Sequence, residues 1–223
     1  MLSQKKVILI MLKKLTAHLV IAGLLMFSAT AHAGSYEDFF TAISRDNAAE
    51  ISELLARGFD VNSRSSKGQS GLFEALQKDS QKAVVVLMQA ESLDVNALND
   101  KGESALMMAA LKGKLDVCER LIQRGARVNK AGWAPLHYAA SGPEPKAVAL
   151  MLERGAELEA ESPNKNTALM MAVRYAPEAS VDLLLARGAD LKRVNAAGWN
   201  AVELAANEGR EALSKRLAAA VVR

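Results

Sequence analysis

The chain has 223 residues, half of them hydrophobic, with 28 Lys and Arg against 25 Asp and Glu. Cys118 is the only cysteine, which excludes an internal disulfide, so packing alone has to hold the fold together. The formal net charge of +3 is too small to indicate a basic nucleic-acid-binding domain.

Residues 1–33 have the features of a secretory signal peptide. They contain four lysines and no acidic residue, then an apolar run from Leu19 to Phe27, then the small-residue pattern Ala31-His32-Ala33. The apolar run is shorter than the roughly 20 residues that span a bilayer. We therefore expect cleavage after Ala33 and a periplasmic or secreted protein, with an uncleaved anchor as the alternative.

Cleavage would change the charge of the chain. Removing the four lysines of residues 1–33 leaves 24 basic residues against 25 acidic ones, a net charge of −1. We therefore expect no nucleic-acid partner, and no membrane association after cleavage. Met11 is an alternative start, because "MLKK" and the apolar run after it already form a complete signal.

Two sequence motifs recur in phase through the rest of the chain. Gly125 and Gly155 are 30 residues apart, and Gly155 and Gly188 are 33 apart. A fixed period of this length is typical of stacked helical repeats. The first motif is "LLARGFDVN" (54–62), "LIQRGARVN" (121–129), "MLERGAELE" (151–159) and "LLLARGADL" (183–191), with a copy that lacks the glycine at 86–96. The second motif is "KGQSGLFEAL" (67–76), "KGESALMMAA" (101–110), "AGWAPLHYAA" (131–140), "NKNTALMMAV" (164–173) and "AGWNAVELAA" (197–206).

Both motifs resemble those of the ankyrin repeat, over nearly all of residues 35–223. The resemblance implies an all-α solenoid of stacked helix-turn-helix units joined by β-hairpin-like loops. We expect one domain, residues 34–223, with about six helix pairs, of which the first and the last cap the stack. We expect this domain to be a monomer.

His137 falls on the histidine of the family's T-P-L-H motif. The resemblance makes it a structural residue that hydrogen-bonds within and between neighbouring repeats, rather than a catalytic base or a metal ligand. Ala134 replaces the threonine that normally caps this helix, so we expect a locally weak unit in which His137 finds a backbone or water partner. Cys118 occupies a position held by valines in other copies, which favours a buried thiol; an exposed redox-sensitive thiol is the alternative.

The sequence shows no Gly-rich phosphate loop, no paired-carboxylate motif and no nucleophile elbow. One histidine and one cysteine in the repeats are too few for a zinc site. We therefore predict that the protein is not an enzyme and that it has no cofactor and no metal.

Ankyrin domains bind other proteins through a concave face made of loop tips and first-helix ends. Because Trp, Tyr and Arg are enriched in binding hot spots, aromatic residues on this face are the leading candidates. The residues that the resemblance places there as candidate partner contacts are Glu103, Lys112, Trp133, Arg174, Tyr175 and Trp199.

One loop is shorter than the others. Two residues separate Asn129 from Gly132, whereas five separate Asn96 from Gly102. We predict a notch at this point, with Trp133 at its floor, into which a loop or side chain of the partner inserts.

The leading functional hypothesis is a non-enzymatic protein-interaction module in the periplasm, which binds one protein partner and protects or assembles an exported enzyme. Three alternatives stay open: an inhibitor or immunity protein that neutralises a toxin, a secreted effector that targets host proteins, and an enzyme of unfamiliar type.

Mass spectrometry of the exported protein tests the signal-peptide prediction. Cleavage after Ala33 leaves a chain that begins at Gly34. A chain recovered with residues 1–33 still attached would contradict it.

Overall fold

The computed structural model describes residues 34–221, so the predicted signal peptide lies outside the described residues. Within them the chain forms six helix pairs. The first pair is the helical segment 34–44 with α2 (Ala48–Ala56). The other pairs are α3 (Gly71–Gln77) with α4 (Gln81–Gln89), α5 (Ala105–Leu111) with α6 (Leu115–Gln123), α7 (Pro135–Ala139) with α8 (Pro145–Glu153), α9 (Ala168–Tyr175) with α10 (Glu178–Ala186), and α11 (Ala201–Asn207) with α12 (Glu211–Val221).

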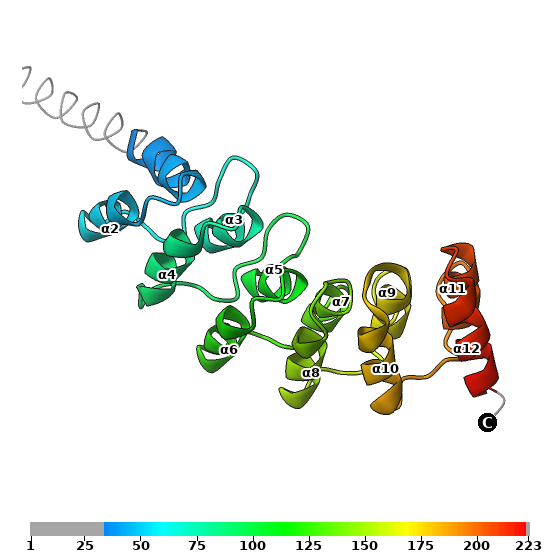
Figure 1. Ribbon diagram of the computed structural model, residues 1–223. Helices are drawn as coiled ribbons and strands as arrows, with labels where there is room; N and C mark the ends of the chain where they lie inside the picture. The colour runs from blue at the N-terminus through cyan, green and yellow to red at the C-terminus, as the bar shows by residue number, and fades with distance from the viewer. Residues whose placement is uncertain (1–33, 222–223) are drawn as a thin grey trace, which may run out of the picture.

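The pairs stack side by side into a curved solenoid. Figure 1 shows two rows of helices. The inner row, on the concave side, contains segment 34–44, α3, α5, α7, α9 and α11, and the outer row contains α2, α4, α6, α8, α10 and α12. We call the five connections between consecutive pairs fingers one to five; they comprise residues 57–70, 90–104, 124–134, 154–167 and 187–200.

The inner helices are short and almost wholly buried. In α5, for example, every residue from Ala105 to Ala110 is buried, and in α9 every residue from Ala168 to Val173 is. The methionine pairs of these two helices are core residues of this kind. Because an inner helix has no solvent face of its own, it is stable only between its neighbours in the stack.

Polar caps start most of the inner helices. The hydroxyls of Ser70 and Ser104 accept hydrogen bonds from the amides of Phe73 and Met107, and Thr167 caps α9 in the same way. Each cap satisfies a backbone donor that the first helical turn leaves unpaired. Ala134 has no such side chain, and α7, which it precedes, spans only five residues.

Asparagine side chains join one pair to the next. Asn96 donates from Nδ2 to the Gly125 carbonyl at 3.0 Å and accepts at Oδ1 from the Arg127 amide at 2.9 Å. Asn62 and Asn129 make the equivalent two bonds to the turns that follow them. Gly125 ends its helix with a φ of 87°, a backbone conformation that favours glycine.

These features confirm the predicted fold class, an all-helical solenoid. The fingers are hairpin-like, with isolated antiparallel bridges between Arg64 and Ser70 and between Leu98 and Ser104. None of the helices in residues 34–221 combines the length and the apolar character needed to cross a membrane.

The missing cap of α7 gives a stability prediction. Among the described residues the His137 amide donates only to the Ala134 carbonyl, at 3.0 Å, and a hydroxyl at position 134 would give it the side-chain acceptor that the other capped helices have. We expect Ala134→Ser to stabilise the protein by about 1 kcal/mol, which raises the thermal midpoint by about 2–4 °C. Ala131→Ser, at an exposed site outside any cap, is the control and should leave the midpoint unchanged. If Ala134→Ser and the wild type have the same thermal midpoint, the missing side-chain cap does not weaken α7.

Candidate protein-binding face

The inner row and the fingers hold five of the six candidate contact residues, and the sixth, Lys112, directly follows α5; the structure does not gather them at one place. Arg174, Tyr175 and Trp199 lie at the C-terminal end, on α9 and finger five. Glu103 and Trp133 lie in the middle of the stack. Lys112 follows α5 and pairs with Asp79 instead of lying next to the other five.

Trp199 lies beside a hollow between fingers four and five. The hollow has a volume of about 430 Å³ and also contains Arg174. Trp199 is 40% exposed, and Tyr175, next to Arg174 in the chain, is 57% exposed. The other lining residues are Asn164, Asn166, Asn195, Ala196, Ala197 and Leu204.

Internal contacts hold the guanidinium of Arg174 in place. Its Nε donates to Oε1 of Glu208 at 2.8 Å, and its Cζ lies 5.2 Å from the centroid of the Tyr175 ring. An arginine fixed by an ion pair and an aromatic face loses less side-chain entropy when it binds a partner than a mobile one does.

Hydrogen bonds between fingers four and five form the polar wall of the hollow. The amide nitrogen of the Asn195 side chain donates to Oδ1 of Asn166 at 3.0 Å. The backbone amide of Ala196 donates to the Asn164 carbonyl at 2.9 Å. The two fingers therefore present Trp199 from a shared, cross-linked surface.

In the middle of the stack, Glu103 and Trp133 are engaged within the protein. Tyr138 donates to Oε1 of Glu103, and Asn99 donates to Oε2, each at 2.7 Å. The half-buried ring of Trp133 stands edge-on to Tyr138, with centroids 6.3 Å apart. Burial, together with the Glu103 carboxylate, raises the pKa of Tyr138. Sequence reasoning missed Tyr138, although it was the only aromatic residue at its position in the repeat.

Lys112 bridges two pairs of helices. Its Nζ lies 2.7 Å from Oδ2 of Asp79, and Nζ of Lys114 lies 3.4 Å from Oδ1. The Lys112 ammonium, with Lys114, holds the pKa of the Asp79 carboxyl below its usual value. A partner that used Lys112 would have to compete with this carboxylate.

The short third finger lies beside a hollow of about 390 Å³. In the other four fingers two backbone bonds close the tip; in finger one, for example, Ser65 donates to Gln69 and Gly68 donates to Ser65, each at 2.8 Å. Neither bond forms between the described residues of finger three. Residues Asn129, Lys130, Ala131, Gly132, Glu157, Ala160 and Glu161 line the hollow. Trp133 is not one of them, because its ring packs toward His137 and Tyr138; the predicted floor position is wrong.

His137 is wholly buried and its imidazole is used for structure. Its Nδ1 accepts from the Ala134 amide at 3.1 Å, so the proton sits on Nε2, which faces the carbonyls of Ala160 and Asn166 at 3.0 Å each. These bonds join α7 to finger four. Ala134 provides the backbone partner that the sequence predicted.

Cys118 is also wholly buried, and burial raises the pKa of its thiol to about 12. A thiol with so high a pKa is a poor nucleophile at neutral pH, which agrees with the predicted core role. In residues 34–221 no group of three or more His, Cys, Asp or Glu side chains is arranged to hold a metal ion.

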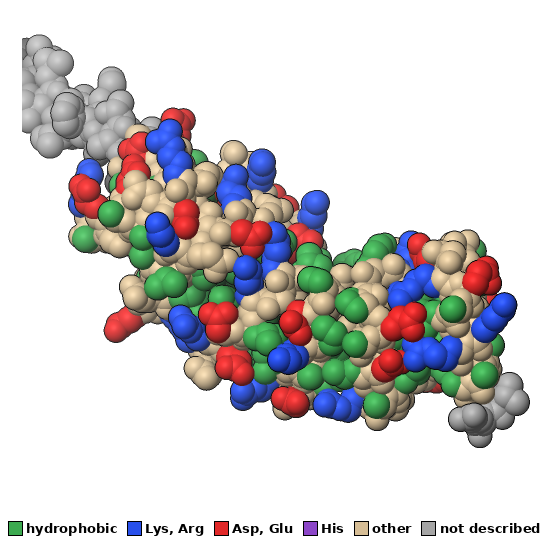
Figure 2. Space-filling view, in the orientation of Figure 1, with side chains coloured by type: hydrophobic (Ala, Val, Ile, Leu, Met, Phe, Trp, Pro, Cys, Tyr) green, Lys and Arg blue, Asp and Glu red, His purple; other side chains and the backbone are tan. Residues whose placement is uncertain are grey.

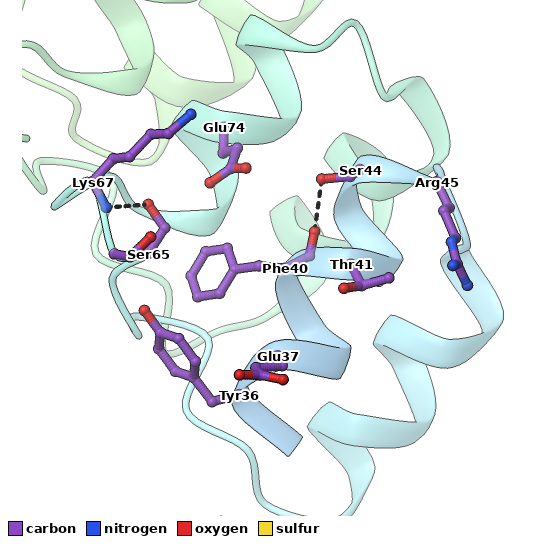
Figure 3. A pocket seen from close by; sticks show the side chains of 10 residues that line it. Tyr36, Glu37, Phe40, Thr41, Ser44, Arg45, Ser65, Lys67 and Glu74 are labelled. Carbon is purple, nitrogen blue, oxygen red and sulfur yellow. Dashed lines mark hydrogen bonds between the residues drawn. The ribbon is translucent and has the colours of Figure 1, made fainter. Parts of the chain in front are cut away.

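A further hollow, of about 460 Å³, lies at the N-terminal end of the concave side. Figure 3 shows it between helical segment 34–44, α3 and the tip of finger one. Its lining residues are Tyr36, Glu37, Phe40, Thr41, Ser44, Arg45, Ser65, Ser66, Lys67 and Glu74. Sequence reasoning did not find it, because its residues come from two different helix pairs.

Comparisons with known sequences agree with the fold. The family description "Ankyrin repeats (3 copies)" matches residues 39–131, 85–162 and 136–221. The ankyrin repeat and KH domain-containing protein mask-1 of Caenorhabditis elegans is 32% identical over 189 residues, which are 77% of this chain and 7% of that protein. A protein of the same description from Caenorhabditis briggsae is 34% identical over 118 residues, 50% of this chain and 4% of that protein. The chain therefore spans a small fraction of the length of these relatives.

A solved structure is similar over nearly its whole chain. It comes from the complex of the predatory endopeptidase Bd0816 of Bdellovibrio bacteriovorus with the immunity protein Bd3460. The matching chain superposes with a TM-score of 0.69 and is 26% identical, over 81% of this chain and 96% of that chain.

The buried imidazole gives a pH prediction. Burial lowers the pKa of His137 below 6.5, against its hydrogen bonds to Asn166, Ala160 and Ala134, which raise it. At a pH between the folded-state pKa and 6.5, His137 therefore binds a proton in the unfolded chain but not in the folded chain. This stability contribution is complete above pH 6.5 and is lost as the pH falls through the lower folded-state pKa. We expect the wild type to lose more stability than His137→Gln between neutral and mildly acidic pH, as measured by urea unfolding.

His18 and His32 are present in both the wild type and His137→Gln, so any contribution they make to the pH dependence of stability cancels in this comparison. Parallel pH dependence in the wild type and in His137→Gln would contradict the assignment.

Proposed function

Because the chain belongs to the ankyrin-repeat family, we propose that it is an exported, non-enzymatic binding protein that holds a protein partner in its concave face. The observation that carries this proposal is the hollow that Trp199 and Arg174 line, with the exposed ring of Tyr175 against the Arg174 guanidinium. Repeat solenoids of this kind use their extended concave surface for binding. The proposal that the protein is exported rests on the signal-peptide features of residues 1–33.

Three points support this hollow as the centre of the contact. Trp, Tyr and Arg are the residue types that dominate measured binding energies. Large apolar side chains on a protein surface are usually scattered singly, whereas the exposed Trp199 lines the same hollow as Arg174, and the exposed Tyr175 ring lies against that arginine. The hydrogen bonds of Arg174 and Asn195 hold the surrounding side chains in place before the partner arrives.

We further propose that the protein is a monomer and that its partner is not a nucleic acid. Residues 34–223 carry nearly balanced charge, with 24 basic and 25 acidic residues. Figure 2 shows the two signs interspersed over the visible face, without a continuous basic stripe. Nucleic-acid binding relies on clustered Lys and Arg.

Substitution of Trp199 tests the contact. We expect Trp199→Ala to weaken partner binding by about 2 kcal/mol, or roughly thirtyfold, because a central aromatic contact is lost. The measurement is the affinity of the purified protein for the partner that the wild type retains from a periplasmic fraction.

Val85→Ala is the matched control. Val85 is 46% exposed on α4, in the outer row, and its loss should change the affinity less than twofold. If Trp199→Ala binds as tightly as Val85→Ala, the hollow is not the centre of the contact.

A second candidate function is inhibition of an exported hydrolase, as an immunity protein does. The similarity to a chain from an endopeptidase–immunity protein complex favours it, since 96% of that chain is covered. A concave face that binds over an enzyme's active site would exclude substrate without any chemistry of its own.

An activity titration tests this second candidate. Purified wild-type protein is added to an exported endopeptidase of the same cell, and substrate turnover is followed. We expect the endopeptidase activity to fall linearly with added wild-type protein and to reach its minimum near one molar equivalent. The Trp199→Ala variant should need a large molar excess to reach the same inhibition. Full turnover at tenfold excess of wild-type protein would reject inhibition and leave simple binding.

A further inference from the structure

One of the charges that line the N-terminal hollow is largely buried. Glu74 lies in α3 and is only 8% exposed. The positions equivalent to it in the other inner helices hold the mainly apolar side chains of Met108, Tyr138, Met171 and Leu204. Burial of a carboxylate costs free energy unless it is paired, so its presence here needs a reason.

The partners of Glu74 within the protein do not account for it. Nζ of Lys78 lies 3.8 Å from Oε1 and is itself 41% exposed. No hydrogen bond to the Glu74 carboxylate forms among the described residues. Figure 3 shows the carboxylate facing the space above the Phe40 ring. The carboxylate is therefore largely buried, pairs with Lys78 and lies at the edge of the hollow.

The rest of the lining suits a flat cation. The rings of Phe40 and Tyr36 are 5.1 Å apart and form an apolar wall. The hydroxyls of Thr41 and Ser44 offer further acceptors around it, whereas the Ser65 hydroxyl already accepts from the amides of Lys67 and Gln69. A guanidinium stacks on aromatic faces and binds a carboxylate through two parallel N–H groups, whereas an ammonium does neither as well.

Two cations, Arg45 and Lys67, also line the hollow, together with the carboxylates of Glu37 and Glu74, and Figure 3 shows the Lys67 side chain extending toward the side of Glu74. Arg45, Lys67 and Glu37 are all exposed, so water screens their charges. Figure 3 shows Arg45 at the far end, directed away from Glu74. The side chain of Glu74 is only 11% exposed, so water screens its charge less than it screens the other three.

We propose that this hollow is a subsite for an arginine side chain of the partner, held by Glu74 and stacked on Phe40. The inference rests on the proposed binding function, since the arginine belongs to the partner. A volume of about 460 Å³ is ample for a guanidinium and its methylene stem. The subsite lies at the opposite end of the inner row from Trp199, so the partner spans the concave face.

A titration with a small molecule tests the subsite without the partner. Amide NMR spectra of the purified protein are recorded with N-acetyl-arginine methylamide and with its neutral isostere N-acetyl-citrulline methylamide. We expect saturable shifts with a millimolar Kd for the arginine compound, at Phe40, Ser65 and Glu74. The citrulline compound should bind about tenfold more weakly, because the charge-assisted hydrogen bonds are lost.

Three variants make the result specific. Glu74→Gln keeps the shape of the side chain and should weaken binding of the arginine compound about tenfold. Phe40→Leu should weaken it about threefold. Glu53→Gln removes the same charge from an exposed site outside the hollow and should have no effect. If Glu74→Gln proves unstable, Phe40→Leu and the citrulline comparison still decide.

Equal shifts with the two compounds, or binding that survives Glu74→Gln, would overturn the subsite. Because this titration uses no partner, its failure leaves the contact at Trp199 standing. Conversely, loss of the Trp199 contact would not alter the arginine titration.

Discussion

The contact between one helix pair and the next holds this protein together, because no pair can bury its own apolar face. The inner helices between the two end pairs are enclosed on both sides, as the wholly buried Leu106 of α5 and Ala172 of α9 show. The asparagines at 62, 96 and 129 add polar bonds between fingers one and two, two and three, and three and four. With a single buried cysteine and no disulfide, the stack depends on these contacts for its stability.

The same stacking determines where side chains can meet a partner. Each pair adds one finger and one inner-helix end to the concave side, so residues far apart in sequence form one surface. Trp199 and Arg174 come together in this way, from finger five and α9. The short third finger shows that length can vary at a tip while the asparagine bond beneath it, at Asn129, is kept.

The repeat pattern was enough to predict the helix pairs, the missing side-chain cap at Ala134 and the structural role of His137. Each of these depends on local sequence or on a position that recurs in every unit. The pairing of Tyr138 with Glu103 and the exposure of Glu74 to a hollow could not be predicted, because both depend on side-chain conformations across a junction. The placement of Trp133 failed for the same reason: its ring turns toward its own helix and away from the shortened tip.

Hydrogen exchange of the protein with and without its bound partner tests the central claim most directly, since it reports on every part of the surface at once. Binding in the concave face predicts slower exchange at the finger tips, above all residues 195–199, and at the end of α9. The outer helices α4, α6, α8 and α10 should exchange unchanged. Protection confined to the outer row, with residues 195–199 exchanging as in the free protein, would contradict the account.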